Sequence, residues 1–340
     1  MNIISKASLK KLNTFGIEAE ASFLASAAET NTVLEILEYK EKNKLSLLIL
    51  GGGSNILFTQ NPASLVLLNR FRGIEILDQI GDDNVLVKVS AGEIWHEFVV
   101  FCIQNNLGGL ENLSLIPGNV GASPMQNIGA YGVEIKDCFY SLDAIQLSDG
   151  RLKTFDASQC NFGYRESIFK NEEKNKWLIT SVTFRLTRKN HVLNTGYGAI
   201  QSELEQAGIV HPGIADISEA VVRIRKSKLP NPAEIGNAGS FFKNPVVAIQ
   251  TLEEIRKNHA DIVAYPINES EVKLAAGWLI EKAGWKGYRE GDAGVHKNQA
   301  LVLVNYGNAS GKEILNLSSK IIEDIQSKFK VTLEREVNII

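Results

Sequence analysis

Apolar residues recur every three or four positions in several parts of the chain, the spacing of a helix that buries one face. The clearest case begins after Ser310 and continues through Phe329. Ser310 and Glu313 match a capping box, which favours a helix that starts there. The residues expected on its buried face are Ile314, Leu317, Ile321, Ile325 and Phe329.

Shorter helices are predicted over residues 30–43, 95–105, 199–206, 218–228 and 274–283. The helix over 30–43 is expected to start with a capping box of Thr32 and Glu35. Its predicted apolar face consists of Val33, Leu34 and Leu37. The helix over 95–105 is expected to end at the pair Gly108-Gly109. Its predicted buried residues are Trp95, Phe98, Val99 and Cys102.

Strands are predicted where apolar residues run continuously or alternate with polar ones. These runs cover residues 45–50, 85–89, 142–147, 178–186, 300–305 and 333–337. No internal repeat and no low-complexity segment interrupts the succession of helices and strands.

The longest irregular stretch is Ile116–Gly132, with the sequence IPGNVGASPMQNIGAYG. Its four glycines and two prolines exclude an ordinary helix or strand, because glycine permits positive φ and proline removes a donor. A tight structural turn is one interpretation, but seventeen residues are too many for a single turn. We favour a shaped loop whose backbone N–H groups face an anionic ligand.

A second glycine-rich segment, Gly51–Asn55, follows the strand predicted over 45–50. It matches neither the P-loop nor the dinucleotide fingerprint. A flexible turn and a phosphate-binding turn are equally compatible with it when it is taken alone. Its separation from the loop 116–132 suits a long ligand with a diphosphate in the middle and an aromatic ring at one end.

Composition and charge narrow the class of protein. The chain has 340 residues, 44% hydrophobic residues, a net charge of −3 and a pI near 6.0. We expect two or three domains with a real core, and the absence of a basic field argues against a nucleic-acid partner. Three cysteines without a CxxC pair indicate a reduced compartment. Neither a signal peptide nor a membrane span is evident, so we expect a soluble cytoplasmic protein.

Polar residues in the predicted loops have both ordinary and functional interpretations. Arg165, in the segment NFGYRES, is a surface residue or a fork for a carboxylate or phosphate. Ser240, in GNAGSFFKNP, belongs to a structured turn or acts as a proton donor, since the GxSxG elbow of a serine nucleophile is absent. Tyr197 lies between two glycines and is mobile unless a ligand holds it. The basic end of the helix over 218–228 is compatible with simple solvation, and Glu336 alone is unremarkable.

Five segments occur together in an order that resembles the UDP-N-acetylenolpyruvoylglucosamine reductase family, in its longer form. They are LGGGSNIL, IPGNVGASPMQNIGAYG, YRESIFK, GNAGSFFKNP and LEREV, and they span nearly the whole chain. The resemblance implies an α+β fold, with an FAD-binding region of the p-cresol methylhydroxylase type and a C-terminal substrate-binding domain. The implied divisions are an FAD-binding subdomain over 1–75 to which 331–340 returns, a second one over 76–225, and the substrate-binding domain over 226–330.

The resemblance also implies roles for individual residues. Ser240, Glu336 and Arg165 would be catalytic, as proton donor, neutral hydrogen-bonding acid and ligand of the substrate carboxylate. Tyr197, Lys228, Asn244 and Gln299 would bind substrate together with Arg165. The residues expected to bind FAD are Gly51, Gly52, Gly53, Ser54, Asn55, Gly118, Gly121, Ala122, Ser123, Pro124, Gln126, Asn127, Gly129 and Gly132. The chain departs from the family at Asn338, where longer members often have arginine.

The implied reaction is the NADPH-dependent reduction of UDP-N-acetylglucosamine enolpyruvate to UDP-N-acetylmuramate through bound FAD, in peptidoglycan precursor synthesis. The expected partners are therefore this UDP-sugar enolpyruvyl ether, FAD and NADPH, without metal, nucleic acid or membrane, and the expected state is a monomer. Two alternatives are a flavin oxidase of the same fold that acts on a small alcohol or hydroxy acid, and a non-enzymatic nucleotide-binding module.

Overall fold

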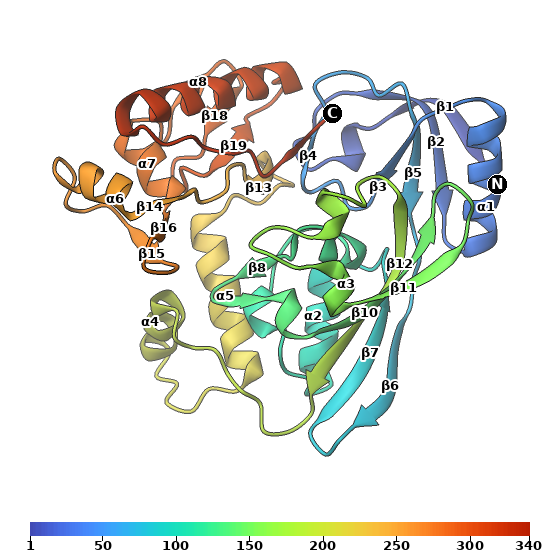
Figure 1. Ribbon diagram of the computed structural model, residues 1–340, viewed down its shortest axis with the longest axis horizontal. Coiled ribbons are helices and arrows are strands. Elements are labelled where there is room, and N and C mark those ends of the chain that lie inside the picture. The colour runs from blue at the N-terminus through green and yellow to red at the C-terminus, as the bar shows by residue number, and fades with distance from the viewer. The chain divides into compact units, whose positions relative to one another are not determined.

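The computed structural model describes residues 1–340, apart from the side chain of Asp78. The chain divides into two compact units, each assembled from separate segments. Unit 1 comprises residues 1–7, 21–52 and 63–227. Unit 2 comprises residues 8–20, 53–62 and 228–340. Helices and strands occur in both, as expected of an α+β protein (Figure 1).

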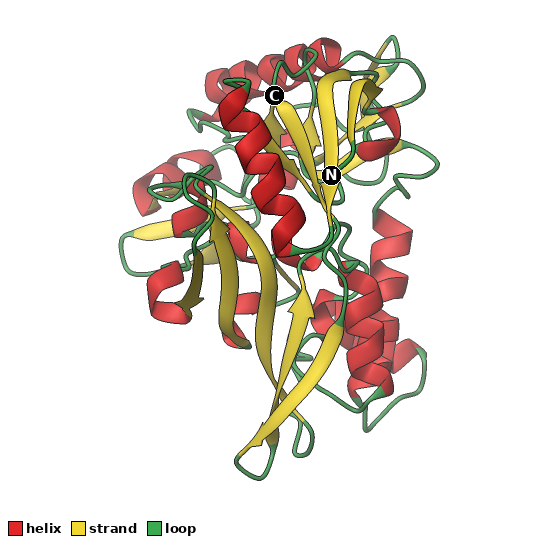
Figure 2. Ribbon diagram, turned by 90° about the vertical axis from the view of Figure 1, so that its right-hand side faces the viewer, coloured by secondary structure: helices red, strands yellow, loops and turns green.

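Unit 1 contains a five-stranded antiparallel sheet, the long curved ribbons of Figure 2. Its strands in spatial order are β11 (Leu152–Asp156), β10 (Phe139–Gln146), β12 (Trp177–Thr187), β7 (Asn84–Ser90) and β6 (Ile74–Ile80). Along β7, Val85, Val87 and Val89 are buried and alternate with less buried residues, the period of a strand with one covered face. The central strand β12 is buried almost continuously, so both of its faces are covered.

Helix α2 (Trp95–Gln104) packs against this sheet through aromatic side chains. The ring centroids of Trp95 and Phe98 lie 5.9 and 5.3 Å from that of Phe184 on β12. All residues predicted to be buried on this helix are buried. The helix ends at Gln104 with Asn105 as its C-cap, within one residue of the predicted range, but the pair Gly108-Gly109 does not terminate it, because Gly108 instead pairs with Thr187 of β12.

A second sheet of unit 1 has the order β1 (Ile3–Ser8), β2 (Glu20–Ala27), β5 (Leu65–Asn69) and β3 (Leu47–Leu50). Helix α1 (Thr30–Lys42) contributes Val33, Ile36 and Leu37 to the same core. The predicted capping box is wrong, since Glu29 is the N-cap and the Thr32 hydroxyl donates to the Glu29 carboxylate at 3.4 Å. Leu34, placed on the predicted apolar face, is 41% exposed, because the face that packs on the core carries Val33, Ile36 and Leu37 instead.

Unit 1 also contains helices α3 (Ala157–Cys160), α4 (Gly198–Gln206) and α5 (Ile214–Lys228), the last being the long yellow helix of Figure 1. Helices α4 and α5 bury Ile200, Leu204, Ile217, Val221 and Ile224 in a small core of their own. Its short remaining elements are η2 (Glu111–Leu113), η3 (Val120–Ala122), η4 (Pro124–Gln126), β8 (Gly129–Ala130), β9 (Val133–Glu134), η5 (Ile135–Asp137) and η6 (Ile168–Lys170).

Unit 2 contains three sheets. The largest has the order β13 (Gly236–Ser240), β19 (Val302–Asn305), β18 (Ala293–Val295) and β17 (Arg289–Glu290). The second has the order β14 (Val246–Ala248), β16 (Glu271–Leu274) and β15 (Ala264–Pro266), and β20 (Asn338–Ile339) pairs with β4 (Ile56–Leu57). The helices are η1 (Lys10–Leu12), α6 (Ile249–Arg256), α7 (Ala276–Lys282) and α8 (Gly311–Phe329).

Helix α8 confirms the prediction made from its capping box and its periodicity. The Ser310 hydroxyl accepts from the Glu313 N–H, and all five residues of the predicted face are buried. Two other predictions fail in detail. Leu274 ends a strand instead of starting a helix, and residues 333–337 form a single isolated bridge at Arg335 instead of a strand.

The unit break between Ser227 and Lys228 lies two residues beyond the expected start of a substrate-binding domain at 226. The finer division of the N-terminal part at 75/76 stays a prediction. No helix within the described part of the chain is long and apolar enough to cross a membrane.

Candidate cofactor and substrate site

The two glycine-rich loops meet within unit 1. A Cβ atom at Gly52 would lie 2.5 Å from Asn119 Oδ1 and 3.0 Å from the Gly118 Cα. A side chain at position 52 would therefore force Asn119 or the Gly118 backbone to shift. Asn119 is held in place because its Nδ2 donates to the Gly92 carbonyl at 2.7 Å. The approach of two bare backbone segments that the sequence places far apart is the geometry expected of a cofactor cradle.

Much of the loop 116–132 is stabilised by the protein itself. The N–H groups of Val120 and Gly121 donate to the carbonyls of Glu93 and Ala91, each at 2.9 Å. A Cβ at Gly121 would lie 2.5 Å from the Ala91 Cβ, so this glycine permits close packing of the two segments. These two N–H groups therefore face protein carbonyls and are not available to an anionic ligand.

Three residues predicted to bind FAD are buried inside the loop. Ser123 donates through its hydroxyl to the Val120 carbonyl at 2.7 Å, and Pro124 begins the turn η4. Asn127 is fully buried in a left-handed conformation, with φ at 45°. Its side-chain amide donates to Glu134 and to the Gly163 carbonyl, both at 2.9 Å. Ser123, Pro124 and Asn127 thus shape the loop.

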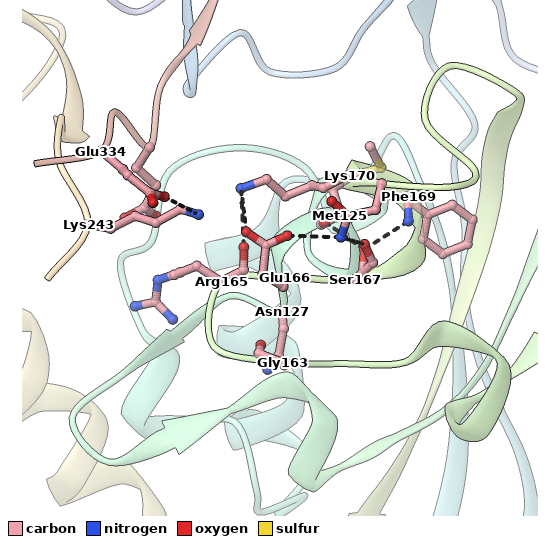
Figure 3. A network of polar contacts seen from close by, with 12 residues as sticks. Met125, Asn127, Gly163, Arg165, Glu166, Ser167, Phe169, Lys170, Lys243 and Glu334 are labelled. Atoms are coloured by element: carbon pink, nitrogen blue, oxygen red, sulfur yellow. Dashed lines mark hydrogen bonds and ion pairs between the residues drawn. The ribbon is translucent and has the colours of Figure 1, made fainter. Parts of the chain in front are cut away.

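Arg165 lies in a tight turn beside this loop. Gly163 and Glu166 exchange two backbone hydrogen bonds, of 3.0 and 3.2 Å, around it, and Arg165 itself has a φ of +57°. Its Nη2 donates to the Gly129 carbonyl at 2.6 Å. Figure 3 shows the neighbouring contacts, in which Ser167 donates to the Met125 carbonyl at 2.7 Å. The guanidinium is therefore tied to the glycine-rich loop, as its candidate role requires.

Tyr197 stands against the C-terminal end of the same loop. Its ring meets the Tyr131 ring edge to face, with centroids 5.3 Å apart, and Tyr197 remains 42% exposed. A Cβ at either flanking glycine, Gly196 or Gly198, would meet no atom within 4 Å. The segment that carries Tyr197 is therefore open around its backbone, which suits a residue that moves over a ligand.

The pattern of residues on α5 had suggested only a solvated basic end, yet Arg225 faces the interior. Its Nε donates to the Leu115 carbonyl at 3.2 Å, and its guanidinium interacts electrostatically with the Tyr131 hydroxyl. Burial lowers the pKa of Arg225, while Tyr131 raises it. Arg225 thus joins the two ends of the glycine-rich loop. A lone arginine on a basic helix carries no sequence signal for this role.

His96 stabilises the N-terminal end of the glycine-rich loop, at Leu115. Its Nδ1 accepts the Leu115 N–H at 3.0 Å, at a residue whose φ is +58°. Burial, followed by the positive charges of Arg225 and Lys226, lowers the pKa of His96. His96 therefore fixes the backbone of Leu115, the residue before the glycine-rich loop.

In unit 2, Ser240 and Glu336 are brought onto neighbouring segments. Ser240 ends β13, and the carbonyl of the next residue, Phe241, accepts the Glu336 N–H at 2.8 Å. The phenylalanine pair after Ser240 is fully buried, at 0% for Phe241 and 1% for Phe242, and anchors this segment. Both candidate catalytic side chains are half-buried.

The turn before Ser240 is fixed by a buried amide. Asn237 donates through its side chain to the carbonyls of Pro230 and Ile235, at 3.2 and 2.9 Å. The Asn237 Oδ1 accepts the N–H of Gly239, which has a φ of +70°. These bonds set the direction of the chain as it enters Ser240.

Asn55 connects the first glycine-rich segment to the C-terminus. Its Nδ2 donates to the Glu336 carbonyl at 3.2 Å, and its own carbonyl accepts from the Asn338 side chain at 2.9 Å. Asn338 is therefore a structural residue of the β20–β4 pair. Gly53 is packed so closely that a Cβ would lie 2.0 Å from the Leu12 carbonyl oxygen.

Asn244 and Gln299 each lie near the start of α7. The Asn244 Oδ1 accepts the Ala276 N–H at 2.9 Å. The Gln299 Oε1 would lie 3.4 Å from a Cβ at Gly277 and accepts the Leu301 N–H at 3.3 Å. Lys228 is the exposed last residue of α5.

An exposed face of the three-stranded sheet was not predicted. Val246, Lys273 and Tyr265 lie side by side across β14, β16 and β15. The Lys273 Nζ is 6.0 Å from the centre of the Tyr265 ring. In the sequence this face shows only the alternation of apolar and polar residues in a short strand, a pattern that any solvent-exposed strand can have.

Among the described side chains, no cluster of His, Cys, Asp and Glu could hold a metal ion.

Known families match most of the chain. The model of an FAD binding domain matches residues 21–156, and that of the C-terminal domain of UDP-N-acetylenolpyruvoylglucosamine reductase matches residues 231–340. The reductase of Flavobacterium johnsoniae is 54% identical over 100% of both chains. That of Pseudomonas fluorescens Pf-5 is 50% identical over 100% of this chain and 99% of its own.

Solved structures agree in fold. UDP-N-acetylenolpyruvylglucosamine reductase from Thermus caldophilus has a TM-score of 0.66 at 22% identity, covering 99% of this chain and 98% of its own. p-Cresol methylhydroxylase has a TM-score of 0.51 at 12% identity, covering 96% and 83%. The fold is thus that of FAD-binding proteins of the p-cresol methylhydroxylase type. The chain belongs to the UDP-N-acetylenolpyruvoylglucosamine reductase family, whose members are FAD-dependent oxidoreductases.

Proposed function

We propose that this chain reduces UDP-N-acetylglucosamine enolpyruvate to UDP-N-acetylmuramate with NADPH and bound FAD, in the synthesis of peptidoglycan precursors. The structural observation that carries the proposal is the pairing of Glu336 with Phe241, which sets Ser240 and Glu336 on adjacent segments. A proton donor and a second hydrogen-bonding acid are the groups that this reduction needs beside the cofactor.

The residues present fit FAD. Gly51, Gly52 and Gly118 offer bare backbone where the two loops meet, and Asn119 fills the space that a side chain at position 52 would occupy. Held by these residues, FAD would supply the hydride-transfer chemistry between NADPH and the enolpyruvyl double bond. Of the other predicted FAD residues, we propose direct contacts for Gly53, Ser54, Ala122, Gln126 and Gly132. Gly121, Ser123, Pro124, Asn127 and Gly129 instead give the loop its shape.

Arg165 stabilises the charge that develops during the reaction. As the β carbon receives hydride, the electron pair of the double bond moves toward the α carbon and its carboxylate. A guanidinium stays charged at any physiological pH and can donate two parallel N–H hydrogen bonds to a carboxylate. Preorganised charge of this kind is usually the largest catalytic contribution.

Ser240 completes the reduction by giving a proton to the α carbon. The hydroxyl then regains a proton from water or from a neighbouring group. Glu336 assists by donating a hydrogen bond to the substrate carboxylate, which requires its protonated form because a carboxylate would repel the developing charge. Both side chains stand on backbone fixed by the buried Phe241 and Asn237.

The UDP-sugar is bound by the remaining candidates. We assign the diphosphate to Lys228 and Tyr197, the nucleotide end to Asn244 and Gln299, and closure over the substrate to Tyr197. NADPH and the enolpyruvyl sugar bind to the enzyme in turn, in a ping-pong scheme.

We expect the enzyme to be a monomer in the cytoplasm. Its three buried free thiols, Cys102, Cys138 and Cys160, suit a reducing compartment.

The direct test is to purify the protein and follow NADPH oxidation with and without UDP-N-acetylglucosamine enolpyruvate. We expect a yellow protein, NADPH oxidation that depends on the UDP-sugar, and a product heavier by two hydrogens. Rapid oxygen consumption with a small alcohol and no dependence on the UDP-sugar would instead identify an oxidase. A colourless protein that gains no flavin from added FAD would identify a binding module.

A further inference from the structure

A carboxylate lies beside the guanidinium proposed to bind the substrate carboxylate. The Glu134 Oε1 is 3.8 Å from the Arg165 Nη1, and both side chains are mostly buried, at 22% and 19% exposure. The second oxygen of Glu134 is held by the Asn127 amide at 2.9 Å and the Lys136 ammonium at 3.1 Å. Glu134 is thus a fixed group with one oxygen directed at Arg165.

The surrounding backbone is adapted to this pair. A Cβ at Gly129 would lie 2.8 Å from the Glu134 Cγ and 3.0 Å from the Arg165 Nη1. The glycine therefore leaves room for both side chains to cover the same stretch of loop. The Gly129 carbonyl in turn accepts the Arg165 Nη2. One glycine supplies both the space and the acceptor.

Arg165 needs such support because its own backbone is unfavourable. A φ of +57° is rare for a long side chain and persists only where the surroundings determine it. Lys170 Nζ donates to the Arg165 carbonyl at 3.1 Å, which secures the main chain but not the guanidinium plane (Figure 3). Glu134 and the Gly129 carbonyl contact the guanidinium itself.

We infer that Glu134 is a positioning residue that sets the plane of the Arg165 guanidinium for the enolpyruvyl carboxylate. A planar guanidinium recognises a carboxylate through parallel N–H groups only when its plane is fixed. The charge of Glu134 opposes substrate binding, so its benefit lies in orientation. Asn127 acts one step further out, by holding Glu134. This inference rests on the proposed function.

The test uses stopped-flow measurements of the two half-reactions. Glu134→Ala should lower the rate at which the enolpyruvyl sugar reoxidises the reduced enzyme by about 10- to 100-fold, the scale of a lost orienting contact. Reduction of the enzyme by NADPH should be unchanged. Glu134→Gln, which keeps an acceptor oxygen and the shape, should recover part of the lost rate. If the alanine variant loses its flavin, the glutamine variant alone tests the inference, by the same comparison of a slowed reoxidation with an unchanged reduction by NADPH.

A double-variant cycle separates orientation from general damage. If Glu134 acts through Arg165, adding Glu134→Ala to Arg165→Ala should slow reoxidation no further. Asp149→Asn removes the charge from a carboxylate that pairs with Arg151 at 2.7 Å in an exposed turn, and it should leave both rates unchanged. Equal losses in both half-reactions, or full additivity in the double variant, would overturn the inference. A wild-type enzyme that the UDP-sugar cannot reoxidise would refute the proposed function instead.

Discussion

The side-chain amide of Asn55 donates a hydrogen bond of 3.2 Å to the main-chain carbonyl of Glu336, although the two residues are 281 positions apart. The bond joins the first glycine-rich segment to the residue proposed as the second acid of the reaction. The position of Glu336 therefore depends on the segment Gly51–Asn55. A substitution at Asn55 should consequently slow the step in which the substrate is reduced.

We expect Asn55→Ala to lower the free energy of unfolding by about 1 kcal/mol, the usual net value of one hydrogen bond. Asn55→Asp has the same shape but turns an acceptor toward the Glu336 carbonyl, so it should be the more harmful of the two. Denaturant unfolding of both variants gives the comparison. If aspartate is tolerated better than alanine, the bond does not have the role described.

Gly52→Ala should lower the FAD content of the purified protein. The added methyl group would meet Asn119 at 2.5 Å and the Gly118 backbone at 3.0 Å, so one of the loops must move. The ratio of flavin to protein absorbance measures the effect. Gly213→Ala is the matched control, because its Cβ would meet one atom, at 3.6 Å, and the backbone has no positive φ. Normal flavin content in Gly52→Ala would remove this contact from the cofactor cradle.

Tyr197→Phe should weaken substrate affinity and substrate inhibition while NADPH still reduces the enzyme normally. The phenylalanine ring can keep the edge-to-face contact with Tyr131, so the variant tests the hydroxyl alone. A hydrogen bond to a charged diphosphate contributes about 1.5–3 kcal/mol, or about 10- to 100-fold in affinity. The KM for the enolpyruvyl sugar and the reduction rate decide the matter. Equal losses in both half-reactions would contradict a lid role.

His96 should make the stability of the protein depend on pH. Burial and the nearby positive charges lower its pKa in the folded protein, so below pH 6.5 the unfolded chain binds more protons at this residue than the folded one. Its contribution is complete above pH 6.5 and is lost as the pH falls through the lowered pKa.

Replacing this histidine tests the origin of that dependence. His96→Gln should therefore lose less stability than the wild type between about pH 7 and about pH 5, the range in which histidine titrates. Urea unfolding at the two pH values measures it. His296, whose pKa burial also lowers, remains in the variant and keeps part of the dependence. Identical pH dependence in both proteins would exclude His96 as a source.

Local features of the structure were predictable from the sequence. Helix α8 was found with its N-cap because Ser310 and Glu313 bond to each other within one turn. The start of α1 at Thr30 was also predicted, but its cap was not, since Thr32 and Glu35 match a capping box in sequence while the true N-cap is Glu29. A capping motif inside a helix looks like one at its start.

The candidate site residues stay a prediction, and the contacts that several of them make within the protein could not be foreseen from the sequence. Asn127 was expected to face FAD, yet its amide is used by Glu134 and by a carbonyl from the Arg165 turn. Arg225 was overlooked because a basic helix end is normally solvated. Such roles depend on contacts between segments far apart in the chain, and periodicity and motifs carry no information about them.

The central claim is that Ser240 gives the final proton to a substrate held on this flavoenzyme. Stopped-flow traces of Ser240→Ala test it most directly, with Ser240→Cys as the variant that can still donate a proton. Reduction by NADPH should be near normal in both. Reoxidation by UDP-N-acetylglucosamine enolpyruvate should fall by about 10²- to 10⁴-fold in the alanine variant, the usual contribution of a positioned general acid, and by less in the cysteine variant. Near-normal reoxidation of the alanine variant would contradict the claim and move the proton donor to another group.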